Sequence, residues 1–130
     1  MKSALIIHPD FYDRCDLEDF LNKRSYRVAT AKSIRKGLFK LRGQVFRCLI
    51  VKAPDQLEYC LALIHEIRKL RPQVPIIFLK REVTEQFAET LSQQPEVYLV
   101  LEPFSKIDLL RRLDGLCEQE VSSAPSVNAR

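Results

Sequence analysis

The chain has 130 residues, of which 46% are hydrophobic and 29% charged, with a formal net charge of +4 at pH 7. This length suits one domain with a real core, and the composition is that of an ordinary globular protein. No apolar run approaches the roughly 20 residues of a membrane-spanning helix, and the first run is too short for a secretory signal. We therefore expect a cytoplasmic protein without a membrane span.

Short apolar runs alternate with longer amphipathic stretches along the whole chain. The runs predict five strands, at 4–7, 26–29, 46–51, 75–79 and 97–101. The stretches between them predict helices that begin at about Asp16, after Ser33, at Leu57, after Thr84 and after Ser105. This order predicts a single-domain α/β protein with a (βα)5 flavodoxin-like fold, a five-stranded parallel sheet with helices on both faces.

The last ten residues differ from the rest in composition. Residues 121–130 are small, polar and proline-containing, which is typical of a flexible tail or a linker. We expect the domain to occupy residues 1–120. The tail is either a tether to an output domain or a plain disordered end.

Four cysteines, Cys15, Cys48, Cys60 and Cys117, stand too far apart for a CxxC motif, and the chain has two histidines. Three of these cysteines lie in apolar patterns, where a thiol behaves as a small hydrophobe. We expect structural thiols in a reducing compartment, without a metal site or a cofactor.

Two stretches, EIRKLRPQVPIIFL at 66–79 and LEPFSKIDLL at 101–110, resemble the receiver domain of two-component response regulators. The resemblance covers residues 4 to about 117. It implies the receiver fold and, for typical members, transfer of a phosphoryl group onto an aspartate with Mg²⁺ held by acidic residues.

The positions that carry this chemistry hold other residues here. By the resemblance, the acceptor aspartate corresponds to Lys52, the acidic pair to His8 and Pro9, the hydroxyl residue to Lys80, and the lysine before the fifth-strand proline to Glu102. An amine cannot form an acyl phosphate, and these residues do not supply the carboxylates that Mg²⁺ prefers. The resemblance thus implies a pseudo-receiver, a non-enzymatic signalling module that is not phosphorylated and acts by protein–protein interaction.

The exchanged charges suggest two further hypotheses. Lys52 and Glu102 would form a reversed ion pair across the mouth of the pocket, because a lone desolvated charge there would be costly. Alternatively Lys52, Lys80 and Arg81 would make the pocket a small-anion sensor.

The charge distribution along the chain is uneven. Between Asp19 and Asp55 there are ten lysines and arginines and no acidic residue. On the predicted second helix, Lys32, Lys36 and Lys40 form one i, i+4 row, flanked by Arg35 and Arg42. This pattern favours a surface that docks an acidic protein partner, although weak nucleic-acid binding through the same helix is an alternative.

The region around the fourth helix, fifth strand and fifth helix is a second candidate surface. By the resemblance, receivers often dimerise there, and mixed charges at this place could pair across a two-fold axis. The residues concerned are Glu85, Glu89, Tyr98, Lys106, Arg111 and Arg112.

Overall fold

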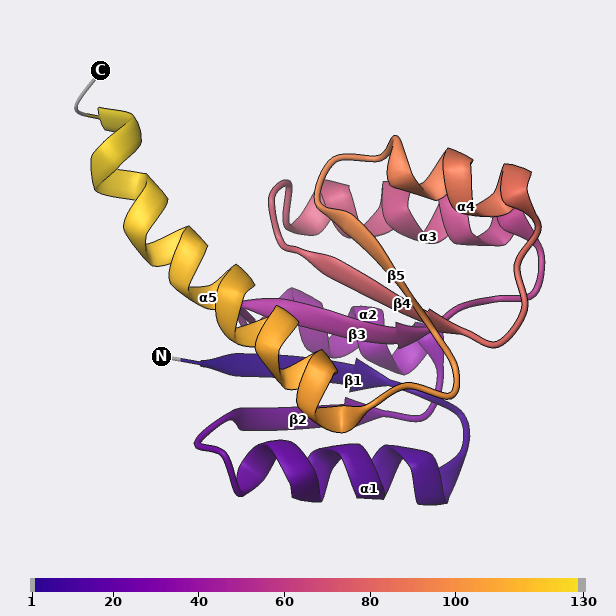
Figure 1. The fold of residues 1–130 in the computed structure, drawn as a ribbon, viewed down its shortest axis with the longest axis horizontal. Helices are drawn as coiled ribbons and strands as arrows, with labels where there is room; N and C mark the ends of the chain where they lie inside the picture. The colour runs from indigo at the N-terminus through magenta and orange to yellow at the C-terminus, as the bar shows by residue number, and fades with distance from the viewer. Residues whose placement is uncertain (1, 129–130) are drawn as a thin grey trace.

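The computed structural model describes the backbone of residues 2–128 and the side chains of residues 2–117. Its elements are β1 (Ser3–Ile7), α1 (Phe11–Asn22), β2 (Arg27–Ala31), α2 (Ile34–Gly43), β3 (Cys48–Lys52), α3 (Leu57–Leu70), β4 (Ile76–Lys80), α4 (Glu85–Ser92), β5 (Val97–Leu101) and α5 (Lys106–Asn128). The strands form one parallel sheet in the order β2-β1-β3-β4-β5 (Figure 1). This confirms the predicted flavodoxin-like (βα)5 fold.

The helices cover both faces of the sheet, and each face has its own apolar core. On one face, Leu17 and Leu21 of α1 and Leu109 and Leu113 of α5 pack against the sheet. On the other face, α2, α3 and α4 pack against the alternate strand residues. The central strands are buried on both sides, which explains their continuous apolar runs in the sequence.

Side-chain caps determine where several helices begin. Ser33 and Thr84 accept hydrogen bonds from the backbone N–H groups of Lys36 and Phe87, as the sequence predicts. The prediction for α1 is wrong, because this helix begins at Phe11 rather than near Asp16. Asp10 caps it by accepting from the Asp13 N–H at 2.9 Å. Phe11 and Tyr12 in its first turn are exposed, so the apolar periodicity begins later than the helix.

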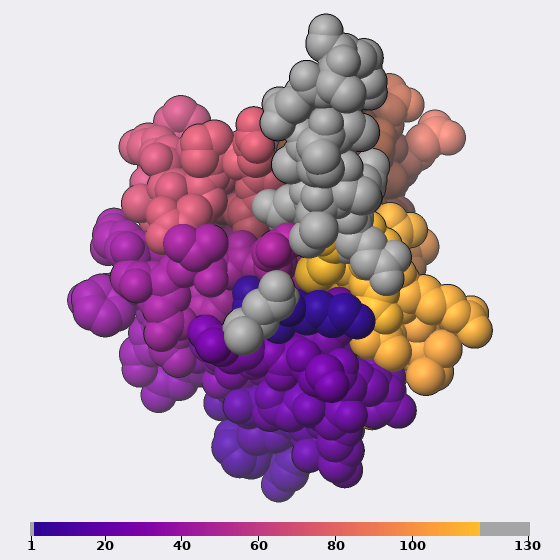
Figure 2. Space-filling view, turned by 90° about the vertical axis from the view of Figure 1, so that its left-hand side faces the viewer, coloured from indigo at the N-terminus to yellow at the C-terminus, as the bar shows by residue number. Residues whose placement is uncertain are grey.

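The start of the chain lies beside α5, at the end of the molecule where the strands begin (Figure 2). Tyr26 donates from its hydroxyl to Asp114 at 2.8 Å, and the Lys2 ammonium pairs with the same carboxylate at 3.1 Å. These contacts join the first two strands to the last helix.

The helix α5 extends to Asn128, so the expected boundary at residue 120 falls inside a helical segment. Side chains beyond Cys117 lie outside the described residues, and the division into a domain and a tail stays a prediction. None of the described helices combines the length and the apolar character needed to cross a membrane.

Candidate functional site

The predicted pocket residues meet at the edge of the sheet where the strands end. Lys52 and Lys80 are the last residues of β3 and β4, while His8 and Glu102 follow β1 and β5 directly. The parallel register brings these ends together, and the Glu102 N–H donates to the Lys80 carbonyl at 2.8 Å. Pro9 lies beside them but is exposed.

Lys52 and Glu102 form the predicted ion pair. The Lys52 ammonium donates to Oε1 of Glu102, from residues 50 positions apart in the sequence. The Glu102 side chain is 12% exposed and that of Lys52 is 30% exposed. The pair is therefore partly desolvated, and each charge there depends on the other.

Lys80 lies on the other side of the same edge. Its side chain is 13% exposed, with its ammonium 3.7 Å from the Asp55 carboxylate and 5.3 Å from the centre of the Phe87 ring. The Lys52 charge is neutralised by Glu102, whereas the Asp55 side chain facing Lys80 is fully exposed. The small-anion sensor stays a prediction.

His8 is a buried polar side chain at the same edge. Its Nδ1 accepts a hydrogen bond from the Asp10 N–H at 3.1 Å, so the proton of the neutral ring is on Nε2. Burial lowers the pKa of His8 despite the opposing influence of Asp13 and Glu102. The ring is therefore neutral at pH 7.

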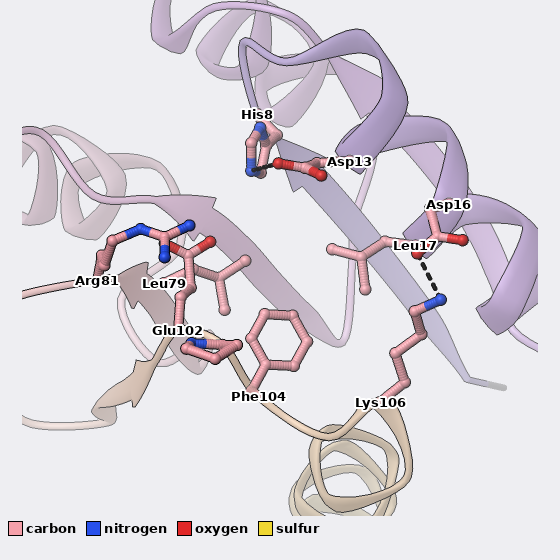
Figure 3. Close-up of a pocket in the computed structure, with 10 residues that line it drawn as sticks. His8, Asp13, Asp16, Leu17, Leu79, Arg81, Glu102, Phe104 and Lys106 are labelled. Atoms are coloured by element: carbon pink, nitrogen blue, oxygen red, sulfur yellow. Dashed lines mark ion pairs between the residues drawn. The ribbon is translucent and has the colours of Figure 1, made fainter.

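A pocket of about 220 Å³ opens beside this edge, between α1 and the connection from β5 to α5 (Figure 3). Of the residues predicted for the pocket, His8, Arg81 and Glu102 line it. Asp13, Asp16 and Phe104 also line it, with Lys106, which the sequence placed on a dimer face. Lys106 instead pairs with Asp16 across the pocket mouth. Within the part of the chain that the structure describes, no three His, Cys, Asp or Glu side chains form a group suited to a metal ion.

The fold was compared with known proteins. No family model and no curated protein matches the sequence. Solved structures do match. The chemotaxis protein CheY4 of Vibrio cholerae is 19% identical with a TM-score of 0.78, and the match covers 89% of this chain and 98% of that one. A CheY-like response regulator receiver domain protein from Methanospirillum hungatei is 24% identical with a TM-score of 0.76, over 94% and 98% of the two chains.

A third match is the receiver domain of a sensor histidine kinase from Pseudomonas aeruginosa, whose structure holds a magnesium ion in its active-site cleft. It is 20% identical with a TM-score of 0.73, over 90% of this chain and 98% of that one. This chain has the receiver fold. At these identities the likeness establishes the fold alone, so the site must be interpreted from its own residues.

The exposed side of α2 carries the predicted basic surface on this receiver fold. Arg35, Lys36, Lys40 and Arg42 are exposed on α2, while Gly37 and Leu41 are buried beneath them. Lys32 is also exposed, but it precedes the capping residue Ser33, so its predicted place on the helix is wrong. The pKa of Lys36 is lowered, chiefly by the positive charge of Lys32. The cations of this basic surface therefore repel one another, as the sequence pattern indicated.

The structure adds two features to the basic surface. Phe39, which the sequence places near these basic residues, is 72% exposed. Lys40 donates to the backbone carbonyl of Thr30, on the edge strand β2. The surface thus combines cations, an aromatic ring and one edge of the sheet.

Several of the predicted dimer residues make contacts within their own chain. Glu85, Glu89, Arg111 and Arg112 are exposed, but the Arg112 guanidinium lies 5.6 Å from the centre of the Tyr98 ring of its own chain. Arg111 pairs with Asp108 at 3.3 Å. Dimerisation through this region stays a prediction.

Proposed function

We propose that this protein is a signalling module with a receiver fold that acts by binding a protein partner and accepts no phosphoryl group. The observation that carries the proposal is the ion pair between Lys52 and Glu102. By the resemblance, Lys52 stands where receivers carry the acceptor aspartate. An ammonium at that place neutralises Glu102 and offers no carboxylate for an acyl phosphate.

The ion pair also has a structural consequence, in addition to the loss of phosphoryl transfer. In the fold's phosphorylated relatives a negative acceptor would face a lysine, whereas here the positive charge lies on β3 and the negative charge follows β5. The attraction between Lys52 and Glu102 does not depend on phosphorylation. We infer a module held in one conformation, whose activity depends on the presence of its partner.

The phosphorylation half of the proposal is tested by incubation with a small phosphodonor, Mg²⁺ and the purified protein. Intact-mass measurement should show no added phosphoryl group on the wild-type protein. The matched variant is Lys52→Asp, which restores a carboxylate at the acceptor position. A phosphoryl group on wild-type Asp10 or Asp55, the two loop aspartates near the pocket, would refute the proposal.

The partner half rests on the basic surface of α2. Four exposed cations on α2 and Lys32 just before it, with no acidic residue on the helix, are suited to an acidic protein surface. The exposed Phe39 ring adds the kind of apolar contact that protein interfaces use at their centre. A base-reading motif is absent from the sequence, so we propose an acidic protein rather than a nucleic acid as the partner.

Capture from lysate with nuclease, followed by titration of the identified and purified partner, tests this choice. Lys32→Glu, Lys36→Glu and Lys40→Glu together should abolish binding, and Phe39→Ala should weaken it about tenfold or more, as expected for an interface hot spot. The matched control exchanges Lys23, Arg24 and Lys69, which are exposed and lie outside both candidate surfaces, for glutamate. Loss of all captured material on nuclease treatment would establish the nucleic-acid alternative instead.

A further inference from the structure

The pocket shown in Figure 3 has apolar walls and a polar rim. Leu17, Leu79 and Phe104 form the apolar part, from α1, β4 and the segment before α5. Its volume of about 220 Å³ corresponds to about seven waters. Such a space suits a ligand of the size of a small amino acid and is below the usual range for larger cofactors.

The charges at the rim are mostly neutralised within the protein. Asp16 pairs with Lys106, and Glu102 pairs with Lys52. Two lining charges, the carboxylate of Asp13 and the guanidinium of Arg81, have no ion-pair partner of opposite charge among the described residues, and both side chains are exposed at the rim. They come from α1 and from the residue after β4, and Figure 3 shows them on different sides of the opening. One acid and one base are thus left for a ligand.

His8 supplies a third polar group. Its side chain is 4% exposed and lines the pocket, and its proton is on Nε2 because Nδ1 already accepts from the Asp10 N–H. The Asp13 oxygen lies 3.7 Å from Nε2, which is beyond hydrogen-bond distance. Water can reach this Nε2–H, and an acceptor on a ligand would replace that water.

We propose that this pocket binds a zwitterionic α-amino acid with a small apolar side chain, such as leucine or valine. The ammonium group contacts Asp13, and the carboxylate accepts from Arg81 and from Nε2–H of His8. The apolar side chain packs against Leu17, Leu79 and Phe104. Asp13 and Arg81 are exposed, so water solvates both charges. A zwitterion is the ligand whose two charges match both of them, whereas a simple anion or cation matches only one.

The test titrates the purified protein with L-leucine up to about 10 mM, a concentration that would saturate a site with a Kd of about 1 mM. The heat of binding and the ¹⁵N resonances of the His8 ring are measured during the titration. Leucine should bind saturably and shift the Nε2 signal. N-acetyl-leucine lacks the cation, leucinamide lacks the anion and glycine lacks the side chain. Each should bind about tenfold more weakly or worse.

Protein variants test the same contacts from the other side. Asp13→Asn and Arg81→Gln should each weaken leucine binding about tenfold, while Asp19→Asn and Arg111→Gln, outside the pocket, should leave it unchanged. Circular dichroism checks that each variant is folded. Absence of saturable binding overturns the proposal, as does equal affinity for N-acetyl-leucine or tighter binding of inorganic phosphate. The proposed partner binding and resistance to phosphodonors are measured separately, so either proposal can fail alone.

Discussion

The ion pair between Lys52 and Glu102 can be tested by a double-mutant cycle. We expect Lys52→Met to be more destabilising than Glu102→Gln, because the Glu102 carboxylate is 12% exposed while Lys52, at 30%, has more access to water. Removal of the lysine leaves the nearly buried Glu102 carboxylate without a partner. Lys52 left without Glu102 can instead extend its ammonium into solvent.

The magnitude follows from this partial burial. Exposed pairs contribute about 0–1 kcal/mol, and removal of one partner from a fully buried pair costs about 3–5 kcal/mol. For this intermediate case we expect Lys52→Met to cost about 2 kcal/mol and Glu102→Gln about 1 kcal/mol, with a coupling energy of about 1 kcal/mol.

Urea unfolding followed by far-UV circular dichroism is the suitable assay, because the chain has no tryptophan. The pair of Asp19 and Lys23, one helical turn apart and about two-thirds exposed, is the matched control cycle. Its coupling should be about 0.3–0.5 kcal/mol. A coupling at Lys52 and Glu102 no larger than this control, or a smaller effect of Lys52→Met than of Glu102→Gln, would refute the reasoning.

Two further predictions concern the fold beneath the site. Gly37→Ala would place a Cβ atom 2.6 Å from Cγ1 of buried Ile7; we expect it to destabilise by about 1–3 kcal/mol, whereas Gly43→Ala, with nothing within 4 Å, should be neutral or slightly stabilising in thermal unfolding. The pKa of His8 is lowered by burial and by Lys52, against the influence of Asp13, Glu102 and Asp10, so the unfolded chain binds more protons just below pH 6.5 and stability should fall as the pH drops through this range. His8→Asn, whose carbonyl can still accept from the Asp10 N–H, should flatten this part of the stability profile, and an unchanged slope would show that other groups cause it.

Local patterns in the sequence were enough for most of the secondary structure. The bounds of α3 and β5 agree with the prediction, since α3 has one continuous apolar stripe and β5 a compact apolar run before Glu102. Both depend on neighbours within a few residues, which a sequence displays directly. The early start of α1 was missed because Phe11 and Tyr12 are apolar but exposed.

The site depended on contacts between distant parts of the chain. The sequence, through its resemblance to receivers, indicated that Lys52 and Glu102 face each other, and it indicated the basic side of α2. It could not show that Lys80 is directed toward Asp55 and Phe87, because residues near one sheet edge can point to either side.

The pocket beside His8 was decided by tertiary structure alone. Its walls come from α1, β4 and the start of α5, which only the folded sheet brings together. The proton position on His8 likewise follows from one backbone hydrogen bond with Asp10 and from burial. The sequence by itself determined the fold, because this follows from local periodicity, and its resemblance to receivers implied the exchanged charges at Lys52 and Glu102. Which of those charges remain available to a ligand was decided by tertiary packing, because pairing depends on distances in space.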